Sequence, residues 1–270
     1  MTSAWRGRTE ALAVCVAVAL WWPAARASAS AADHSIERLN AEDQAVLHEL
    51  LAQLEPLITQ RKHEATVNLL TFEELYVPLN REQRAFLDWI RSLTPEDAGG
   101  VHVPLGAAPH TLAAFERIES QAYTDSQHQR IVLDPQYLPD RVLAAYRRLA
   151  SAMERDIGRR LLVESGYRAP AYQLYLFCFY LPTHDMSVRE TNRFVALPGY
   201  SEHGAPQRQA IDFINNDGVN GDGKPESFEA LPEYHWLQQH AQEYGFALSY
   251  PRDNPWATSF EPWHWHYEER

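Results

Sequence analysis

Apolar residues recur at helical spacing in the first third of the chain. From residue 40 onwards they stand three or four positions apart, at Val46/Leu47, Leu50/Leu51, Leu54 and Leu57/Ile58. This is the pattern of a helix with one buried face. Asn40, with Asp43 three residues later, predicts the N-cap of this helix, and Pro56 is expected to kink or end it. A second helix is predicted over residues 80–93, where Asn80 and Gln83 have the spacing of a capping box.

The pattern changes after about residue 112. An amphipathic helix is predicted over residues 138–158, and the apolar run in RRLLVESGYR predicts a short strand directly after it. Residues 234–251 predict another helix that ends at Gly245 and is followed by the strand FALSY. Short strands between helices predict an α+β domain, with a small antiparallel sheet and flanking helices, preceded by the N-terminal helical region.

The first 29 residues have the layout of a secretory signal peptide. Arg6 and Arg8 give a positive start, ALAVCVAVALWW is an apolar run, and small residues at A-x-A spacing follow near Ala27. The run is shorter than the roughly 20 apolar residues that span a bilayer, so no stable membrane span is expected once the segment is removed. We expect a signal peptide at 1–29, a helical region of unknown role at 33–110, a catalytic domain at 111–270, and a periplasmic or secreted protein.

Composition excludes several classes of protein. Hydrophobic residues make up 45% of the chain and charged residues 22%, so the chain is globular rather than disordered. The formal net charge is −12 and no basic stripe is present, so no nucleic-acid partner is expected. Cys178 is the only cysteine outside the expected signal peptide. The mature protein therefore has no internal disulfide and depends on its core or on a metal for stability.

Three stretches carry residues that suit a metallopeptidase: SGYRAPAYQ (165–173), GYSEHGAPQRQAIDF (199–213) and FEPWHWHYE (260–268). A zinc hydrolase needs three ligands from His, Asp or Glu, a fourth position for water, and a carboxylate that handles the proton of that water. His203, Asp212 and His264 could supply the ligands, and Glu261 lies three residues before His264. Each of these residues alone is more often an ordinary polar residue, so the joint pattern carries the prediction.

The same three stretches resemble the VanY-type D-alanyl-D-alanine carboxypeptidases, zinc peptidases related to D-Ala-D-Ala dipeptidases, phage endolysins and the hedgehog domain. The resemblance rests on a Ser-Gly-Tyr-Arg turn at 165–168, a Ser-x-His at 201–203 that runs to an Ala-x-Asp at 210–212, and a Glu-x-Trp-His at 261–264. The motifs stand in the order of that family, and the resemblance covers about residues 112–270.

The resemblance implies a site and a chemistry. It implies a Zn²⁺ ion bound by His203, Asp212 and His264. It gives Glu261 the role of general base toward the attacking water, and it places Arg168 at the substrate carbonyl or the tetrahedral intermediate. Three further residues are expected to contact the substrate: Ser201, Gln173 and His266. Each has an alternative role: Ser201 is equally suited to capping, Gln173 could only shape the turn, and His266 could support the metal ligands from behind.

Two features of the motifs leave alternatives open. Eight residues, GAPQRQAI, separate His203 from Asp212, where the family usually has six. We expect an enlarged turn before a strand that keeps Ala210 and Asp212 on one face. His264 and His266 also share a strand face, so either could reach the metal, and the Glu-x-Trp-His spacing favours His264.

These observations predict an exported zinc metallopeptidase that acts on peptidoglycan stem peptides or muropeptides, most simply a D-alanyl-D-alanine carboxypeptidase. One alternative is L,D-carboxypeptidase or endopeptidase activity on the same scaffold, which the longer His203–Asp212 segment makes plausible. The other is a non-catalytic, zinc-containing module that binds peptidoglycan. Glu261 argues against that second alternative, because a purely structural zinc site has no use for an unligated carboxylate.

Overall fold

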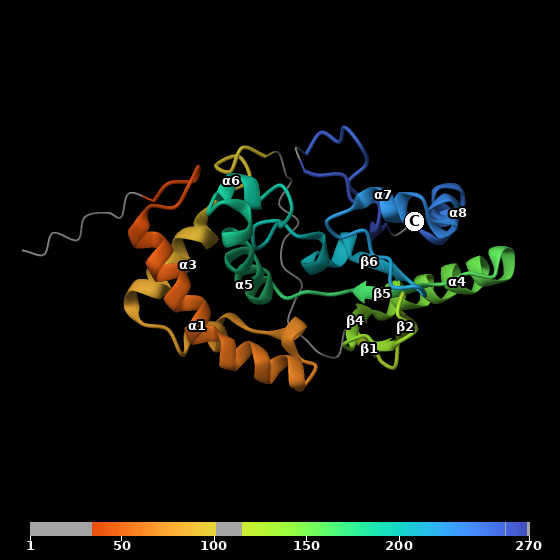
Figure 1. The fold of residues 1–270 in the computed structure, drawn as a ribbon, viewed down its shortest axis with the longest axis horizontal. Helices are drawn as coiled ribbons and strands as arrows, with labels where there is room; N and C mark the ends of the chain where they lie inside the picture. Colours follow the sequence, from red (N-terminus) through yellow and green to blue (C-terminus); the bar gives the residue numbers. More distant parts are fainter. Residues whose placement is uncertain (1–33, 101–114, 257, 269–270) are drawn as a thin grey trace, which may run out of the picture. The chain divides into compact units, whose positions relative to one another are not determined.

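The computed structural model describes residues 34–100, 115–256 and 258–268. The predicted N-terminal helices are present as α1 (Ala41–His63), α2 (Phe72–Tyr76) and α3 (Arg81–Ser92), with a short 3₁₀ turn, η1 (Val67–Leu69) (Figure 1). The side chain of Asn40 accepts a hydrogen bond from the N–H of Asp43 at 2.9 Å. Asn80 and Gln83 form a complete capping box at the start of α3. Both predicted caps are confirmed.

The first helix does not end at Pro56, one of the two expected outcomes, because α1 continues past it to His63. The expected kink stays a prediction. Proline has no N–H, so the carbonyl of Ala52 loses its helical partner. Ala52 and Pro56 are both exposed, however, and water can satisfy that carbonyl. Leu54 and Ile58, on either side of the proline, are buried and hold this part of α1 against the core.

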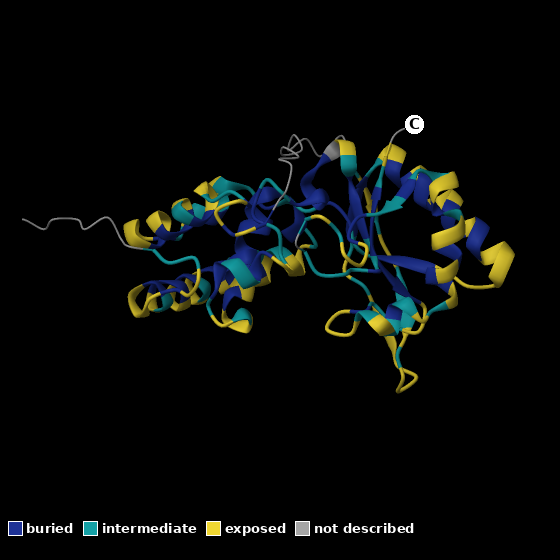
Figure 2. Cartoon of the chain, turned by 90° about the horizontal axis from the view of Figure 1, so that it is seen from above, coloured by how far each residue is buried: buried dark blue, intermediate teal, exposed yellow. Residues whose placement is uncertain are grey.

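One hydrophobic core joins the N-terminal helices to α5 (Pro170–Tyr180). Its buried members include Leu47, Leu50 and Leu54 of α1, Phe86, Leu87 and Ile90 of α3, and Leu174, Phe177 and Cys178 of α5. A helix that is apolar on nearly all sides must be covered on nearly all sides, and Figure 2 shows buried residues where these helices meet. The N–H of Ala169, at the start of α5, also donates to the carbonyl of Asn68 at 2.9 Å. The N-terminal helices therefore support the helix that follows Arg168.

The remaining part of the chain is built on small antiparallel sheets. The largest has the strand order β5 (Leu161–Ser165), β6 (Ala210–Asn215), β8 (His264–Tyr267) and β7 (Phe246–Leu248). Two further pairs join β1 (Phe115–Ile118) to β4 (Gln136–Pro139) and β2 (Ala122–Thr124) to β3 (Arg130–Val132). The helices of this part are α4 (Asp140–Ile157), α7 (Pro225–Glu229) and α8 (Pro232–His240), whereas α6 (Val188–Thr191) contributes Val188 to the first core. The predicted α+β fold is confirmed.

Alternation along the central strands separates a packed face from an open face. Ile211, Phe213 and Trp265 belong to the core that the sheet shares with α4 and α8. Asp212 and His264 stand between these apolar positions and so lie on the opposite face. They are also direct neighbours across the β6–β8 pair. Packing of the apolar residues therefore fixes two of the predicted ligands side by side.

Within the described ranges, no helix has the length and apolarity needed to cross a membrane. The predicted signal peptide lies outside these ranges, as do residues 101–114.

Candidate metal centre

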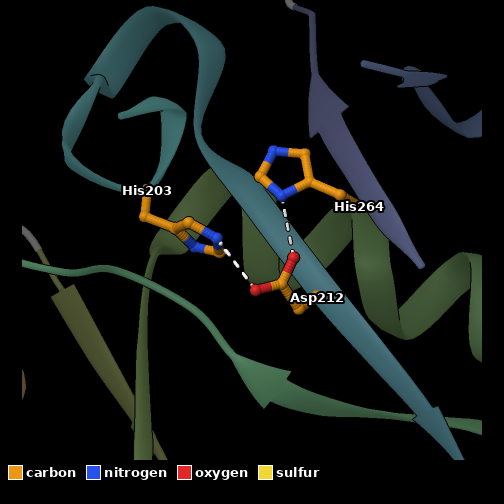
Figure 3. A group of neighbouring side chains, drawn as sticks. All are labelled: His203, Asp212 and His264. Carbon is orange, nitrogen blue, oxygen red and sulfur yellow. Dashed lines mark hydrogen bonds and ion pairs between the residues drawn. The ribbon is translucent and has the colours of Figure 1, made fainter. Parts of the chain in front are cut away.

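Three potential metal ligands converge on the open face of the sheet (Figure 3). His203 comes from the 3₁₀ turn η4 (Glu202–Gly204), Asp212 from β6 and His264 from β8. His203 Nε2 lies 3.0 Å from Asp212 Oδ2, and His264 Nδ1 lies 2.8 Å from Asp212 Oδ1. One potential ligand atom of each residue lies within 4.8 Å of the others. The structure therefore brings together the three residues that the sequence proposes as ligands.

Hydrogen bonds fix which ring nitrogen of each histidine faces Asp212. His203 Nδ1 lies 2.7 Å from the carbonyl oxygen of Gly166. Because a carbonyl only accepts, Nδ1 carries a proton and Nε2 is left to face Asp212. His264 Nε2 lies 3.0 Å from a carboxylate oxygen of Glu202, so Nε2 carries a proton and Nδ1 faces Asp212. Metal-binding histidines are usually oriented by partners of this kind on the second nitrogen.

The donor set fits zinc. Two imidazole nitrogens and a carboxylate oxygen are ordinary zinc ligands, and three protein ligands leave a fourth position free. With metal–ligand bonds of about 2.0–2.1 Å, the ligand atoms of a tetrahedral site lie about 3.3 Å apart. The distances from Asp212 to His203 and His264, 3.0 and 2.8 Å, are close to that value. These residues could therefore hold a zinc ion after small side-chain movements.

Buried charges shift the pKa values of all three groups. Burial favours the neutral form of Asp212, but the charges and hydrogen bonds of His203 and His264 outweigh it and hold the pKa of the carboxyl below its usual range. Burial lowers the pKa of His203. Burial would also lower the pKa of His264, yet Asp212 and Glu202 raise it to about 10. The carboxylate is therefore ionised at neutral pH, and metal binding at His264 Nδ1 would release a proton.

Glu261 lies beside the three potential ligands without belonging to them. Its Oε2 is 3.8 Å from His264 Nδ1. Burial raises the pKa of Glu261 to about 8. The charge of His264 lowers this pKa, and repulsion from Asp212 raises it further. A cation bound between the ligands would lower that pKa. The carboxyl is thus placed where it can take up and release a proton close to neutral pH, as a general base must.

The Ser-Gly-Tyr-Arg turn positions both His203 and Arg168. A Cβ on Gly166 would lie 2.5 Å from the carbonyl oxygen of Tyr137, so only glycine allows the close approach that presents the Gly166 carbonyl to His203. The N–H of Arg168 donates to the carbonyl of His203 at 3.1 Å. The backbone of the turn thereby ties the candidate oxyanion-stabilising residue to the first ligand.

The guanidinium of Arg168 is fixed by two side chains. Nη1 donates to Gln173 Oε1 at 2.8 Å, and Nη2 donates to Ser165 Oγ at 3.0 Å. The same Nη2 lies 3.9 Å from Asp212 Oδ2. The amide of Gln173 donates in turn to the carbonyl of Ala196 at 2.6 Å. Gln173, an expected substrate contact, therefore uses both ends of its amide to hold Arg168 next to the ligands.

The candidate site opens into a cavity of about 640 Å³. Glu261, Arg168 and the three potential ligands line it, together with aromatic side chains that include Tyr250, Phe260 and Trp263. Ser201 and Gln173, two of the expected substrate contacts, are also in the lining. A cavity of this size accommodates a small peptide and presents aromatic and polar groups to it.

Of the two roles that the sequence leaves open for His266, support of the ligands and contact with substrate, the structure favours the first. His266 is buried but is not part of the cavity lining. Its Nδ1 lies 2.7 Å from Ser249 Oγ, and its Nε2 lies 2.9 Å from Glu268 Oε1. The reason is geometric: two residues further along a strand mean a displacement of roughly 6.6–6.8 Å. His266 shares the face of His264 but lies beyond the reach of Asp212 and the cavity.

Sequence reasoning did not identify Glu202 and Arg208. Glu202 is buried and is the partner of His264 Nε2, while Arg208 forms an ion pair with Glu202 at 2.8 Å. Two features of the sequence could have pointed to these residues. Glu202 stands inside the Ser-Glu-His motif, and Arg208 stands in the segment between His203 and Asp212 that is longer than expected.

Comparison with known proteins identifies the family. The family model VanY, D-alanyl-D-alanine carboxypeptidase, matches residues 135–270, half of the chain. The chain belongs to this family. The VanY match contains every residue predicted for the site, and the expected family relationship is confirmed.

Several curated proteins and solved structures are similar to parts of the chain. The bifunctional D-Ala-D-Ala dipeptidase and D-Ala-D-Ala carboxypeptidase VanXYC of Enterococcus gallinarum is 35% identical over 135 residues, which are 48% of this chain and 67% of that protein. The chain spans about half the length of two further curated relatives. Among solved structures, the LdcB LD-carboxypeptidase is 24% identical with a TM-score of 0.46, over 64% of this chain and 77% of that one. A VanY D,D-pentapeptidase in complex with Zn(II) is 23% identical with a TM-score of 0.40, over 55% and 79% of the two chains.

The carboxyl of Glu164, which also lines the cavity, is expected to make the stability of the fold depend on pH. Burial raises its pKa to about 7, against a hydrogen bond from Asn220 and with added repulsion from Asp212. The folded protein holds this proton more tightly than the unfolded chain does. The stability that the proton contributes is therefore complete below about pH 4.5 and is lost as the pH rises through about 7. Glu164→Gln should therefore increase the free energy of unfolding by about 1–2 kcal/mol at pH 8, allowing for partial solvent exposure, and by much less at pH 5.

Urea unfolding of the zinc-free protein at pH 5 and pH 8 measures this difference. The exposed Glu243, which pairs with His240 on the surface, supplies the control variant Glu243→Gln. An equal effect of Glu164→Gln at both pH values would contradict the shifted pKa.

Proposed function

We propose that the chain is a zinc-dependent D,D-carboxypeptidase that removes the terminal D-alanine from peptidoglycan stem peptides. The observation that carries the proposal is the arrangement of His203, Asp212 and His264 around one point, with the carboxyl of Glu261 beside them and not among them. Membership of the VanY family supports the reaction and the substrate class.

The donor chemistry supports zinc as the metal. His203 would bind through Nε2, His264 through Nδ1 and Asp212 through a carboxylate oxygen, the nitrogens being set by Gly166 and Glu202. Zinc in such a site supplies a Lewis acid and brings the pKa of water from about 15.7 toward 7.

The residues around the ligands would carry the remaining steps. Glu261 would accept a proton from the attacking water and then deliver it to the nitrogen of the leaving D-alanine. Arg168, held by Gln173 and Ser165, would donate to the oxygen that gains negative charge as the carbonyl carbon becomes tetrahedral. Because its guanidinium is fixed before substrate binds, little reorganisation would be needed in the transition state.

The longer His203–Asp212 segment gives no support to endopeptidase activity. Of the described side chains between these two ligands, none lines the cavity. The extra residues instead form the 3₁₀ turn η5 (Pro206–Arg208), from which Arg208 reaches Glu202. Because the chain belongs to the VanY family, we rank D,D-carboxypeptidase activity ahead of L,D-carboxypeptidase or endopeptidase activity. Because Glu261 stands beside the potential ligands, we rank a catalytic role ahead of a purely binding one.

Export completes the proposal. The signal-peptide pattern of residues 1–29 supports a mature protein in the periplasm or outside the cell, where peptidoglycan is the available partner. Mass spectrometry of the protein recovered from that compartment tests it. A mature N-terminus between residues 28 and 32 is expected, whereas an intact N-terminus on a protein retained in the cytoplasm would contradict it.

Removal and return of zinc tests the proposed chemistry. We expect dialysis against a chelator to reduce D-alanine release from a purified stem pentapeptide by at least about 100-fold, because both the Lewis acid and the activated water are lost. Addition of one equivalent of Zn²⁺ should restore the rate. Full activity of a preparation that contains no metal by elemental analysis would overturn the zinc mechanism.

A further inference from the structure

Arg208 occupies the centre of a partly buried polar network behind the candidate metal site. Its Nε and Nη2 lie 3.0 and 2.8 Å from Glu202 Oε1. Its Nη1 donates to Glu268 Oε1 at 3.1 Å, and its Nη2 lies 3.3 Å from His266 Nδ1. This one guanidinium therefore connects η4, β8 and the residue that follows β8.

Glu202 connects Arg208 to a potential metal ligand. Oε1 of its carboxylate faces the guanidinium, while Oε2 accepts the hydrogen bond of His264 Nε2 at 3.0 Å. Each oxygen therefore has its own partner, and the carboxylate bridges the arginine to the histidine. Glu202 is 5% exposed, and a carboxylate so deeply buried requires a cation and hydrogen bonds to remain in place.

His266 and Ser249 close the network on its second side. Ser249 Oγ lies 2.7 Å from His266 Nδ1, and Glu268 Oε1 contacts both His266 Nε2 and Arg208. The side chain of Arg208 is 34% exposed, and it is not part of the cavity lining. Arg208 therefore has access to solvent behind the site and no access to a substrate in front of it.

We propose that Arg208 is a positioning residue for the metal site, which holds Glu202 so that His264 keeps Nδ1 directed at the metal. The proposal deepens the proposed function and rests on it. It also gives a role to the longer His203–Asp212 segment, which delivers Arg208 to the back of the site. Without Arg208, the buried carboxylate of Glu202 would lose its cationic partner and rotate toward solvent, and the ring of His264 would lose its fixed orientation.

Substitution of Arg208 is expected to weaken metal binding and not substrate binding. Loss of partners that orient a metal ligand typically costs 10–100-fold in metal affinity or activity. We expect Arg208→Ala to raise the dissociation constant for Zn²⁺ by about 10–100-fold and to leave KM for the stem pentapeptide unchanged once zinc is saturating. Arg208→Lys keeps a cation and should recover part of the affinity.

Zinc affinity, measured by competition with a chromogenic chelator in the absence of substrate, is the primary test. Arg159→Ala is the matched control, because Arg159 forms an exposed ion pair with Asp217 at 3.2 Å far outside the network. In a Glu202→Gln background, Arg208→Ala should cause little further loss, because both changes break the same link. Circular dichroism of each variant establishes that it is folded, and the Glu202→Gln background keeps the test decisive if Arg208→Ala alone is unstable.

Several outcomes would overturn the proposal. One is zinc affinity of Arg208→Ala equal to that of wild type, and another is full additivity of the Arg208 and Glu202 changes. A raised KM at saturating zinc with unchanged metal affinity would assign Arg208 to substrate binding instead. Because affinity is measured without substrate, a wild type that binds zinc but releases no D-alanine would refute the proposed function alone, whereas a wild type that binds no zinc would refute both.

Discussion

Replacement of Glu261 by glutamine is expected to lower the rate of D-alanine release by about 10²–10⁴-fold, the usual contribution of a positioned general base. Glutamine keeps the shape of the side chain but cannot take up a proton from water. Because Glu261 is not among the three potential ligands, the variant should still contain about one zinc per chain. The measurement combines kcat on a stem pentapeptide with elemental analysis of the same sample.

The control for this change is Glu243→Gln, which removes an exposed carboxylate on η6 (Ala241–Tyr244). It should leave both the rate and the metal content unaltered. A Glu261→Gln variant that retained more than about a tenth of the wild-type kcat would show that the proton passes through another group. Loss of zinc together with activity would instead make Glu261 a ligand.

Replacement of His264 by alanine is expected to have the largest effect on metal binding. It removes one of three donors, so the loss of zinc affinity should exceed the roughly 10–100-fold that loss of an orienting partner costs. His266→Ala removes a residue whose ring contacts Ser249 and Glu268 rather than Asp212. Its effect on zinc affinity should stay within that 10–100-fold range.

The two variants together decide which histidine is the third ligand. Titration of each zinc-free variant with Zn²⁺ gives the affinities, and wild type in the same buffer gives the reference. If His264→Ala retained tight zinc binding while His266→Ala lost it, the ligand assignment would be reversed.

Much of the fold follows from local rules. Asn40 and Asn80 mark helix starts because their side chains satisfy N–H groups that the helix itself leaves free. The strand that carries Asp212 was predictable because its apolar neighbours alternate with it and must face a core. The expected helix end at Pro56 was wrong because the exposure of the lost hydrogen bond depends on which side of α1 faces solvent. Packing against α3 and α5, which both follow later in the sequence, decides that side.

The residues of the site could be predicted from the sequence, but the orientation of their side chains could not. Motif spacing brought out His203, Asp212, His264 and Glu261, because each lies in a short stretch with a recognisable neighbour. The ring nitrogens that face Asp212 were not predictable, since they depend on the carbonyl of Gly166 and on a carboxylate contributed by η4.

The long-range network behind the site has no sequence signature of its own. Arg208 meets Glu268 and His266 across about 60 positions of the chain, and no local pattern predicts that encounter. The longer segment between His203 and Asp212 indicated a structural difference at this place, but not its nature. Only the fold shows that the additional residues turn away from the cavity and toward Glu202.

The most direct test of the central claim is mass spectrometry of the products that the zinc-loaded wild type releases from a purified stem pentapeptide and from the matching tetrapeptide. A zinc-dependent D,D-carboxypeptidase should release a single D-alanine from the pentapeptide and leave the tetrapeptide intact. Release of D-alanine from the tetrapeptide alone, or cleavage of neither peptide by protein that holds zinc, would contradict the account.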